Sequence, residues 1–179
     1  MNSQYTNEEL PYREIAEPPE EYSAGAVLGR MVDGLGFRYY WASEGLTQKD
    51  LNFKPSEDAR TTSETIDHIL GLSTTILNSA IHKPNEGNDF SSMTFEEKRA
   101  MTLTNLKRAS DIFRSSEDIS EFTIVFKRAQ GSSEYPIWNH INGPIADAIW
   151  HCGQLVSFRR SSGNPFNSKA SMFQGKLRD

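Results

Sequence analysis

Residues 61–82 read TTSETIDHILGLSTTILNSAIH and predict the best-defined helix of the chain. Thr61 and Glu64 form a capping-box pattern, in which each side chain can satisfy a free backbone amide of the other residue. Isoleucines and leucines then recur at helical spacing. Pro84 ends the pattern, because the residue before a proline usually leaves the α-helical region. We therefore expect this helix to run to about His82.

Two further helices are expected around this one. Apolar residues at steps of three and four from Ala24 onward predict a helix that stops near Gly45. Turn-forming residues then break the helical period. Thr94 and Glu97 repeat the capping-box pattern and predict a helix that continues through Phe113.

The last third of the chain predicts a fourth helix over residues 136–161. Gly143 and Pro144 should break or kink it, since proline disrupts a helix interior and suits a first turn. Residues 122–126, FTIVF, favour a short strand or an extended connector before it. Four helices joined by connections of different lengths predict an all-α fold, a four-helix bundle.

The 179 residues are expected to form one domain with two polar extensions. Residues 1–23 are rich in Glu, Asn and Pro and predict an extended N-terminal arm. Residues 24–165 hold the bundle, and residues 166–179 form a C-terminal tail. We take a homodimer as the default oligomeric state, because such dimers are the commonest oligomers.

Composition excludes several classes of function. The 19 Lys and Arg residues against 24 Asp and Glu residues give a net charge of −5, which argues against binding to duplex nucleic acid. No apolar run approaches the roughly 20 residues that span a bilayer, so no membrane association is expected. The single cysteine, Cys152, excludes an internal disulfide and a multi-cysteine zinc motif. With no secretory signal pattern at the N-terminus, we expect a cytoplasmic protein.

The fourth helix carries the most informative polar residues. Asp147, His151 and Gln154 fall on one narrow stripe of this helix, together with Phe158. Asp147 and His151, four residues apart, could bind one metal ion from a single helix. This spacing more often belongs to a solvated ion pair on a helix surface than to a pair of ligands, so by itself it leaves both interpretations open.

A third ligand is needed if a metal is to keep open positions. Cys152 points away from His151 and is expected to be a small packing residue. Of the other histidines, His82 is expected at the surface, and His140 shares the stripe only if the helix continues through the Gly-Pro pair. His68 lies in the middle of the 61–82 helix, where periodicity neither buries nor excludes it.

Two segments together resemble the DinB-like (YfiT-like) superfamily of metal-binding four-helix bundles. They are TTSETIDHIL, with the EGLTQKDLNFKPSEDAR that precedes it, and DAIWHCGQLVSFRRSSGNP near the end. The family pattern of His-x-Gly-Gln is matched by His151, Gly153 and Gln154, and its single histidine early in the second helix is matched by His68. The resemblance extends from about Leu28 to Pro165.

This resemblance implies a metal site. The family uses three histidines, and the chain matches two of them, His68 and His151, while Asp147 stands at the third position. The implied ligands are therefore two imidazoles and one carboxylate for a divalent ion such as zinc, nickel, iron or manganese. Gln154 could orient a ligand, whereas His140 and Asn142 could line a pocket or pack in the kink.

Known members of the superfamily include transferases that use low-molecular-weight thiols. The resemblance thus implies a metal-dependent thiol S-transferase, in which the metal activates a small thiol for attack on an electrophilic substrate. A metal-dependent hydrolase would use the same ligands. The alternative outside catalysis is a small-molecule-binding or stress-associated module, because a fold does not by itself carry an activity.

Overall fold

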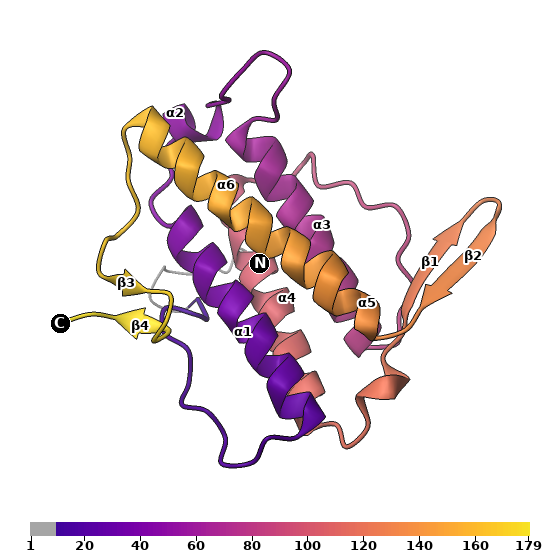
Figure 1. Cartoon of the computed structure of the whole chain (residues 1–179). Coiled ribbons are helices and arrows are strands. Elements are labelled where there is room, and N and C mark those ends of the chain that lie inside the picture. Colours follow the sequence, from indigo (N-terminus) through magenta and orange to yellow (C-terminus); the bar gives the residue numbers. More distant parts are fainter. Residues whose placement is uncertain (1–9) are drawn as a thin grey trace, which may run out of the picture.

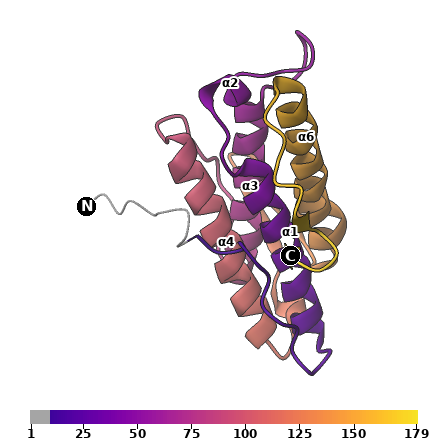
Figure 2. The ribbon, with the colours of Figure 1, turned by 90° about the vertical axis from the view of Figure 1, so that its left-hand side faces the viewer.

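The computed structural model describes residues 10–179, so the first nine residues of the expected N-terminal arm lie outside the described part. Its main body is a bundle of four long helices (Figure 1). They are α1 (Ala24–Ser43), α3 (Thr62–Ala80), α4 (Phe95–Ser115) and α6 (Ala146–Ser162). Both α1 and α3 pack against α4 on one side and α6 on the other, as the side view in Figure 2 also shows. The expected four-helix bundle is confirmed.

Both predicted capping boxes form. The Thr61 amide donates to Glu64 Oε2 at 2.7 Å, and the Glu64 amide donates to Thr61 Oγ1 at 3.1 Å. Thr94 and Glu97 make the same reciprocal pair at the start of α4, at 2.8 and 3.2 Å. Each box satisfies amides that the first helical turn would otherwise leave without partners, which fixes where α3 and α4 begin.

Apolar side chains from all four helices fill the centre of the bundle. Fully buried examples are Val32, Leu35, Ile69, Leu103, Leu106 and Leu155. Burying one such side chain contributes about 1.5–3 kcal/mol. The residues before α1 also reach this core, because Leu10 and Tyr12 are buried there and the Tyr12 hydroxyl donates to Asp33 of α1.

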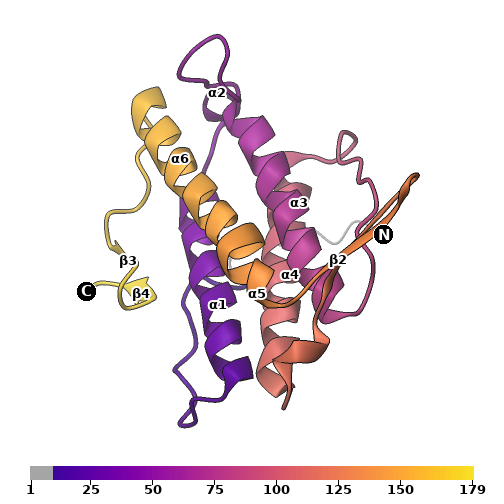
Figure 3. The same cartoon turned by 45° about the vertical axis from the view of Figure 1, so that its right-hand side comes forward.

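The chain is not purely all-α, which corrects the expected fold class. Strand β1 (Ile124–Arg128) pairs antiparallel with β2 (Gly131–Tyr135), so the FTIVF segment does lead into a strand. A second small hairpin joins β3 (Ala170–Ser171) to β4 (Lys176–Leu177) within the expected tail. The partner strand β2 reads GSSEY and carries no alternation of apolar residues that would have predicted it. Figure 3 shows the β1–β2 hairpin projecting beside α3.

Two short helical turns were not predicted from the sequence, in which turn-forming residues follow Gly45. They are α2 (Gln48–Leu51) and the 3-10 turn η1 (Ile119–Glu121). At the start of α2 the Thr47 amide donates to Asp50 Oδ2 at 2.8 Å. Elements of three or four residues are too short to show a helical period.

The expected fourth helix is divided by the predicted kink. It consists of α5 (Trp138–His140), a π turn η2 (Ile141–Ile145) and α6. Gly143 leaves the helical region at φ −98° and ψ −113°, directly before Pro144. Proline lacks the N–H that a continuous helix requires. At the other end, Gly163 caps α6 with a left-handed φ of 96°, as glycine favours.

Within residues 10–179, no helix is both long and apolar enough to cross a membrane.

Candidate metal centre

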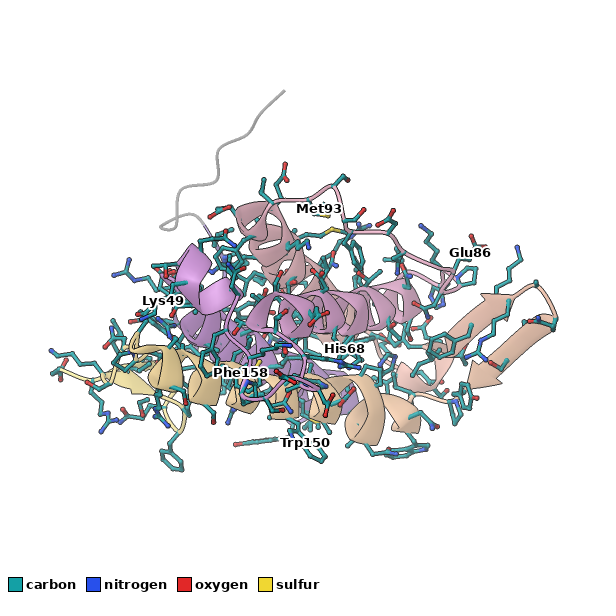
Figure 4. All side chains as sticks on the ribbon, turned by 90° about the horizontal axis from the view of Figure 1, so that it is seen from above. Lys49, His68, Glu86, Met93, Trp150 and Phe158 are labelled. Carbon is teal, nitrogen blue, oxygen red and sulfur yellow. The ribbon has the colours of Figure 1, made fainter. Side chains whose placement is uncertain are left out.

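Three residues predicted as ligands meet at the contact between α3 and α6. His68 comes from the middle of α3, Asp147 from the first turn of α6, and His151 from the next turn of the same helix. One potential ligand atom from each residue lies within 4.8 Å of the others. Figure 4 shows His68 between the two helices, whereas Trp150 points away from the bundle. The local sequence brings Asp147 and His151 together, and helix packing adds His68.

The carboxylate of Asp147 lies between the two imidazole rings. Its Oδ2 is 3.1 Å from His68 Nε2, and its Oδ1 is 3.3 Å from His151 Nε2. The two rings are nearly perpendicular, with centroids 4.5 Å apart. His151 is the most enclosed of the three, with 14% of its side chain exposed, whereas His68 and Asp147 are 34% and 40% exposed. The three residues therefore combine one enclosed histidine, His151, with two side chains that solvent can reach.

Gln154 determines which nitrogen of His151 faces this group. Gln154 Oε1 lies 2.6 Å from His151 Nδ1, and an amide oxygen can only accept a hydrogen bond. With the amide oriented in this way, the neutral ring would carry its proton on Nδ1 and direct the lone pair of Nε2 toward Asp147 Oδ1. Two acceptors at 3.3 Å repel each other unless a cation lies with them or the ring is protonated. This is the arrangement by which proteins orient a metal-binding histidine.

The chain has no match among protein-family models, curated proteins or solved structures. The chemistry of the site therefore follows from the residues that form it.

The donor set and its spacing fit a divalent transition metal. A tetrahedral zinc ion with bonds of about 2.0–2.1 Å separates its ligand atoms by about 3.3 Å. One ligand atom from each of the three residues lies within 4.8 Å of the others, so small movements of the side chains would bring them to this separation. Two imidazoles and one carboxylate are also suitable for iron, manganese or nickel. Three protein ligands leave at least one position open, as in catalytic rather than closed structural sites.

The other residues singled out in the sequence lie elsewhere. His140 is fully buried against Phe113, and neither of its ring nitrogens has a hydrogen-bond partner. Burial lowers the pKa of His140 to about 4. Asn142 is exposed on the π turn, and no hydrogen bond connects it with the three ligands. His82 is exposed, as expected.

Cys152 is buried, and burial raises the pKa of its thiol to about 12. The expectation of a packing cysteine is confirmed. A thiol with this pKa remains protonated at neutral pH and is a poor nucleophile and metal ligand.

A cleft beside His68 was not predicted from the sequence. It has a volume of about 470 Å³ and lies between α3, the loop of residues 85–88 and the end of β1. Its walls come from segments that are far apart in the chain and share no motif. The only indication in the sequence was that FTIVF could form a strand, which says nothing about where that strand packs.

Proposed function

We propose that this protein binds one divalent transition metal ion through His68, Asp147 and His151. The observation that carries the proposal is the hydrogen bond between His151 Nδ1 and Gln154 Oε1. It leaves the Nε2 lone pair of His151 facing a carboxylate, an arrangement that a cation stabilises. With His68 Nε2 on the other carboxylate oxygen, the three side chains supply two neutral donors and one negative charge.

A distant relationship to the DinB-like bundles is part of this proposal. Its support is the position of the ligands, one in the second long helix and two in the last. The chain differs from the family pattern at Asp147, where a carboxylate replaces the third imidazole. A harder oxygen ligand favours zinc, iron or manganese over ions that prefer softer ligands.

The reaction we propose is S-transfer from a low-molecular-weight thiol to an electrophilic substrate. The thiol loses its proton to solvent, its sulfur forms a bond to the electrophilic carbon, and the leaving group departs with the electron pair of the bond that breaks. A thiol bound at an open position of a divalent metal would have a lowered pKa. His68 and His151 hold the ion, Asp147 balances part of its charge, and Gln154 keeps His151 in the correct tautomer. The chain's own Cys152 is buried and protonated, so the attacking sulfur must come from a separate molecule.

Elemental analysis of protein purified without added metal or chelator tests the metal site. We expect close to one equivalent of zinc, iron, manganese or nickel in the wild-type protein. In His151→Ala the bound metal should fall to below about a tenth of that value, because two remaining ligands hold such ions weakly. His82→Ala is the matched control, since it removes an exposed histidine outside the site.

Metal that stays bound in His151→Ala would show that the ligands lie elsewhere. Wild-type protein without metal, even after incubation with each candidate ion, would contradict the proposal and favour a small-molecule-binding module. If metal is bound, thiols and electrophiles are screened with the loaded protein beside ester and amide substrates. Consumption of thiol supports transfer, whereas cleavage without thiol supports a hydrolase.

A further inference from the structure

The cleft beside His68 shares this residue with the proposed metal site, whereas Asp147 and His151 do not line it. The same residue contacts Asp147 through Nε2 and contributes to the wall of the cleft. Along α3 the wall continues to Thr75, which is about 10 Å away at 1.5 Å per residue. Figure 4 shows His68 between the helices and Glu86 beside the hairpin, near the far end. A molecule in the cleft would therefore contact His68, beside the proposed metal site, as well as residues of the hairpin.

Asn85 holds the walls of this cleft together. Its Oδ1 accepts a hydrogen bond from Asn78 Nδ2 of α3 at 3.0 Å, and its Nδ2 donates to the Val125 carbonyl of β1 at 3.0 Å. Its backbone also pairs with β1, through hydrogen bonds with Val125 and Lys127. Because Asn85 is only 5% exposed, these bonds are shielded from water. The hydrogen bonds of Asn85 thus hold the loop of residues 85–88 and strand β1 in place against α3.

The chemistry of the cleft changes along its length. Leu72 and Phe126 provide apolar surface in the wall, while the hairpin end carries Lys127 and Arg128. Lys127 lies 3.5 Å from Glu86 in an exposed ion pair. Arg128 is exposed, and no ion pair or hydrogen bond of its side chain occurs among residues 10–179. These three residues together leave one positive charge, and the other acidic lining residue, Asp67, is paired with Lys98 at 2.6 Å.

We propose that this cleft binds the thiol substrate, and that the thiol carries a single carboxylate at the end opposite its sulfur. The inference rests on the proposed metal site, which receives the sulfur beside His68. The apolar wall accommodates the body of the molecule, and Arg128 pairs with the carboxylate. The single net positive charge of Glu86, Lys127 and Arg128 matches a monoanion better than a doubly charged phosphate.

Calorimetric titration of the zinc-loaded protein tests this inference with two probes of equal length. The probes are 6-mercaptohexanoate, which ends in a carboxylate, and 6-mercaptohexan-1-ol, which ends in a neutral hydroxyl. We expect the acid to bind about fivefold tighter than the alcohol, the size of effect typical of an exposed ion pair. In Arg128→Gln this preference should disappear, while the affinity for the alcohol stays unchanged. Arg108→Gln, which removes an exposed arginine of α4, is the matched control.

Zinc content is measured in each sample, which separates this inference from the metal site. Equal affinities of the two probes for wild-type protein that retains zinc would overturn the carboxylate specificity alone. The same follows if Arg128→Gln weakens both probes equally, or if Arg108→Gln has the same effect. Wild-type protein that fails to hold zinc would overturn the metal site and this inference with it.

Discussion

At the scale of single residues, two histidines of the same helical region have opposite environments. His151 is partly exposed, with one ring nitrogen bonded to Gln154 and the other directed at Asp147. His140 is fully buried, and both its nitrogens lack a partner. Burial without a hydrogen-bond partner favours the neutral form of the ring and lowers the pKa of His140 to about 4. His151 is therefore a proposed metal ligand, whereas His140 should lower the free energy of unfolding in acid.

His140 should make the protein less stable in mild acid. In the unfolded chain the imidazole takes up a proton near pH 6.5, whereas in the folded protein it does so only near pH 4. The folded state therefore loses about 1.4 kcal/mol per pH unit between these values, or about 3 kcal/mol in all. Urea unfolding at several pH values measures this loss. His140→Phe should remove it, whereas His82→Gln, at an exposed position, should leave it unchanged.

Two outcomes would contradict this expectation. One is an equal loss of stability in His140→Phe and in the wild-type protein between pH 6.5 and 4. The other is a flat profile of the wild-type protein in this range.

The pKa of Asp50 is lowered, despite the opposing effect of its burial, by hydrogen bonds from Ser162, Asn164 and Thr47. Its contribution is lost only below about pH 4, so the two effects fall in separate ranges.

Gln154 should matter for metal affinity more than for folding. Gln154→Leu removes the acceptor for His151 Nδ1–H and frees the ring to turn. We expect metal affinity to fall about 10- to 100-fold, as is typical when the partner of a ligating histidine is lost. Competition with a chromophoric chelator measures the affinity, and urea unfolding without metal is the control. An unchanged affinity would mean that Gln154 has no role in holding His151 for the metal.

At the scale of elements, the reciprocal capping boxes fix where α3 and α4 begin. The box of Thr61 and Glu64 begins α3 one residue after Thr61, which places His68 in the second turn of α3. The kink at Gly143 and Pro144 acts in the same way for Asp147, which lies in the first turn after it. Local backbone signals thus place ligands that belong to different helices.

Loss of the α3 cap should destabilise the protein without changing its fold. Thr61→Ala removes the hydroxyl that accepts from the Glu64 amide. We expect the free energy of unfolding to fall by about 1 kcal/mol. Thr104→Ala is the matched control, because Thr104 is exposed within α4 and alanine is the better helix former there. An equal loss in both variants would show that the cap itself contributes nothing measurable.

The sequence predicted those parts of the structure that local patterns encode. Capping boxes and apolar periodicity located the first three long helices, and the Gly-Pro pair located the kink in the fourth. Spacing within one helix paired Asp147 with His151, but only the family resemblance added His68, because its approach depends on how α3 and α6 pack. The polar strand β2 and the cleft near Arg128 had no local signal. Their positions follow from tertiary contacts such as those of Asn85.

At the scale of the whole molecule, the proposed site connects two helices that belong to different parts of the chain. His68 lies in α3, whereas Asp147 and His151 follow the hairpin and the kink in α6. The two helices also contact each other directly along the bundle. A metal ion shared between them would bind the folded state alone, since the unfolded chain separates the ligands.

Metal binding should therefore raise the melting temperature. At a free zinc concentration 100 times the dissociation constant, the folded state gains about 2.7 kcal/mol. For a domain of this size that gain corresponds to a shift of about 5–10 °C. Calorimetry with and without zinc measures the shift, and His151→Ala should show none. A similar shift in that variant would indicate binding at another site.

Cys152 gives the protein an internal reporter of helix undocking. It is the single cysteine of the chain, it is 3% exposed, and it follows His151 directly in α6. A thiol-labelling reagent can reach it only when α6 separates from its neighbours, so the labelling rate measures the population of that open form. Zinc should slow the labelling by the factor with which it stabilises the closed form. Opening of the helix that carries two proposed ligands can thus be followed in the unaltered chain, at the residue next to one of them.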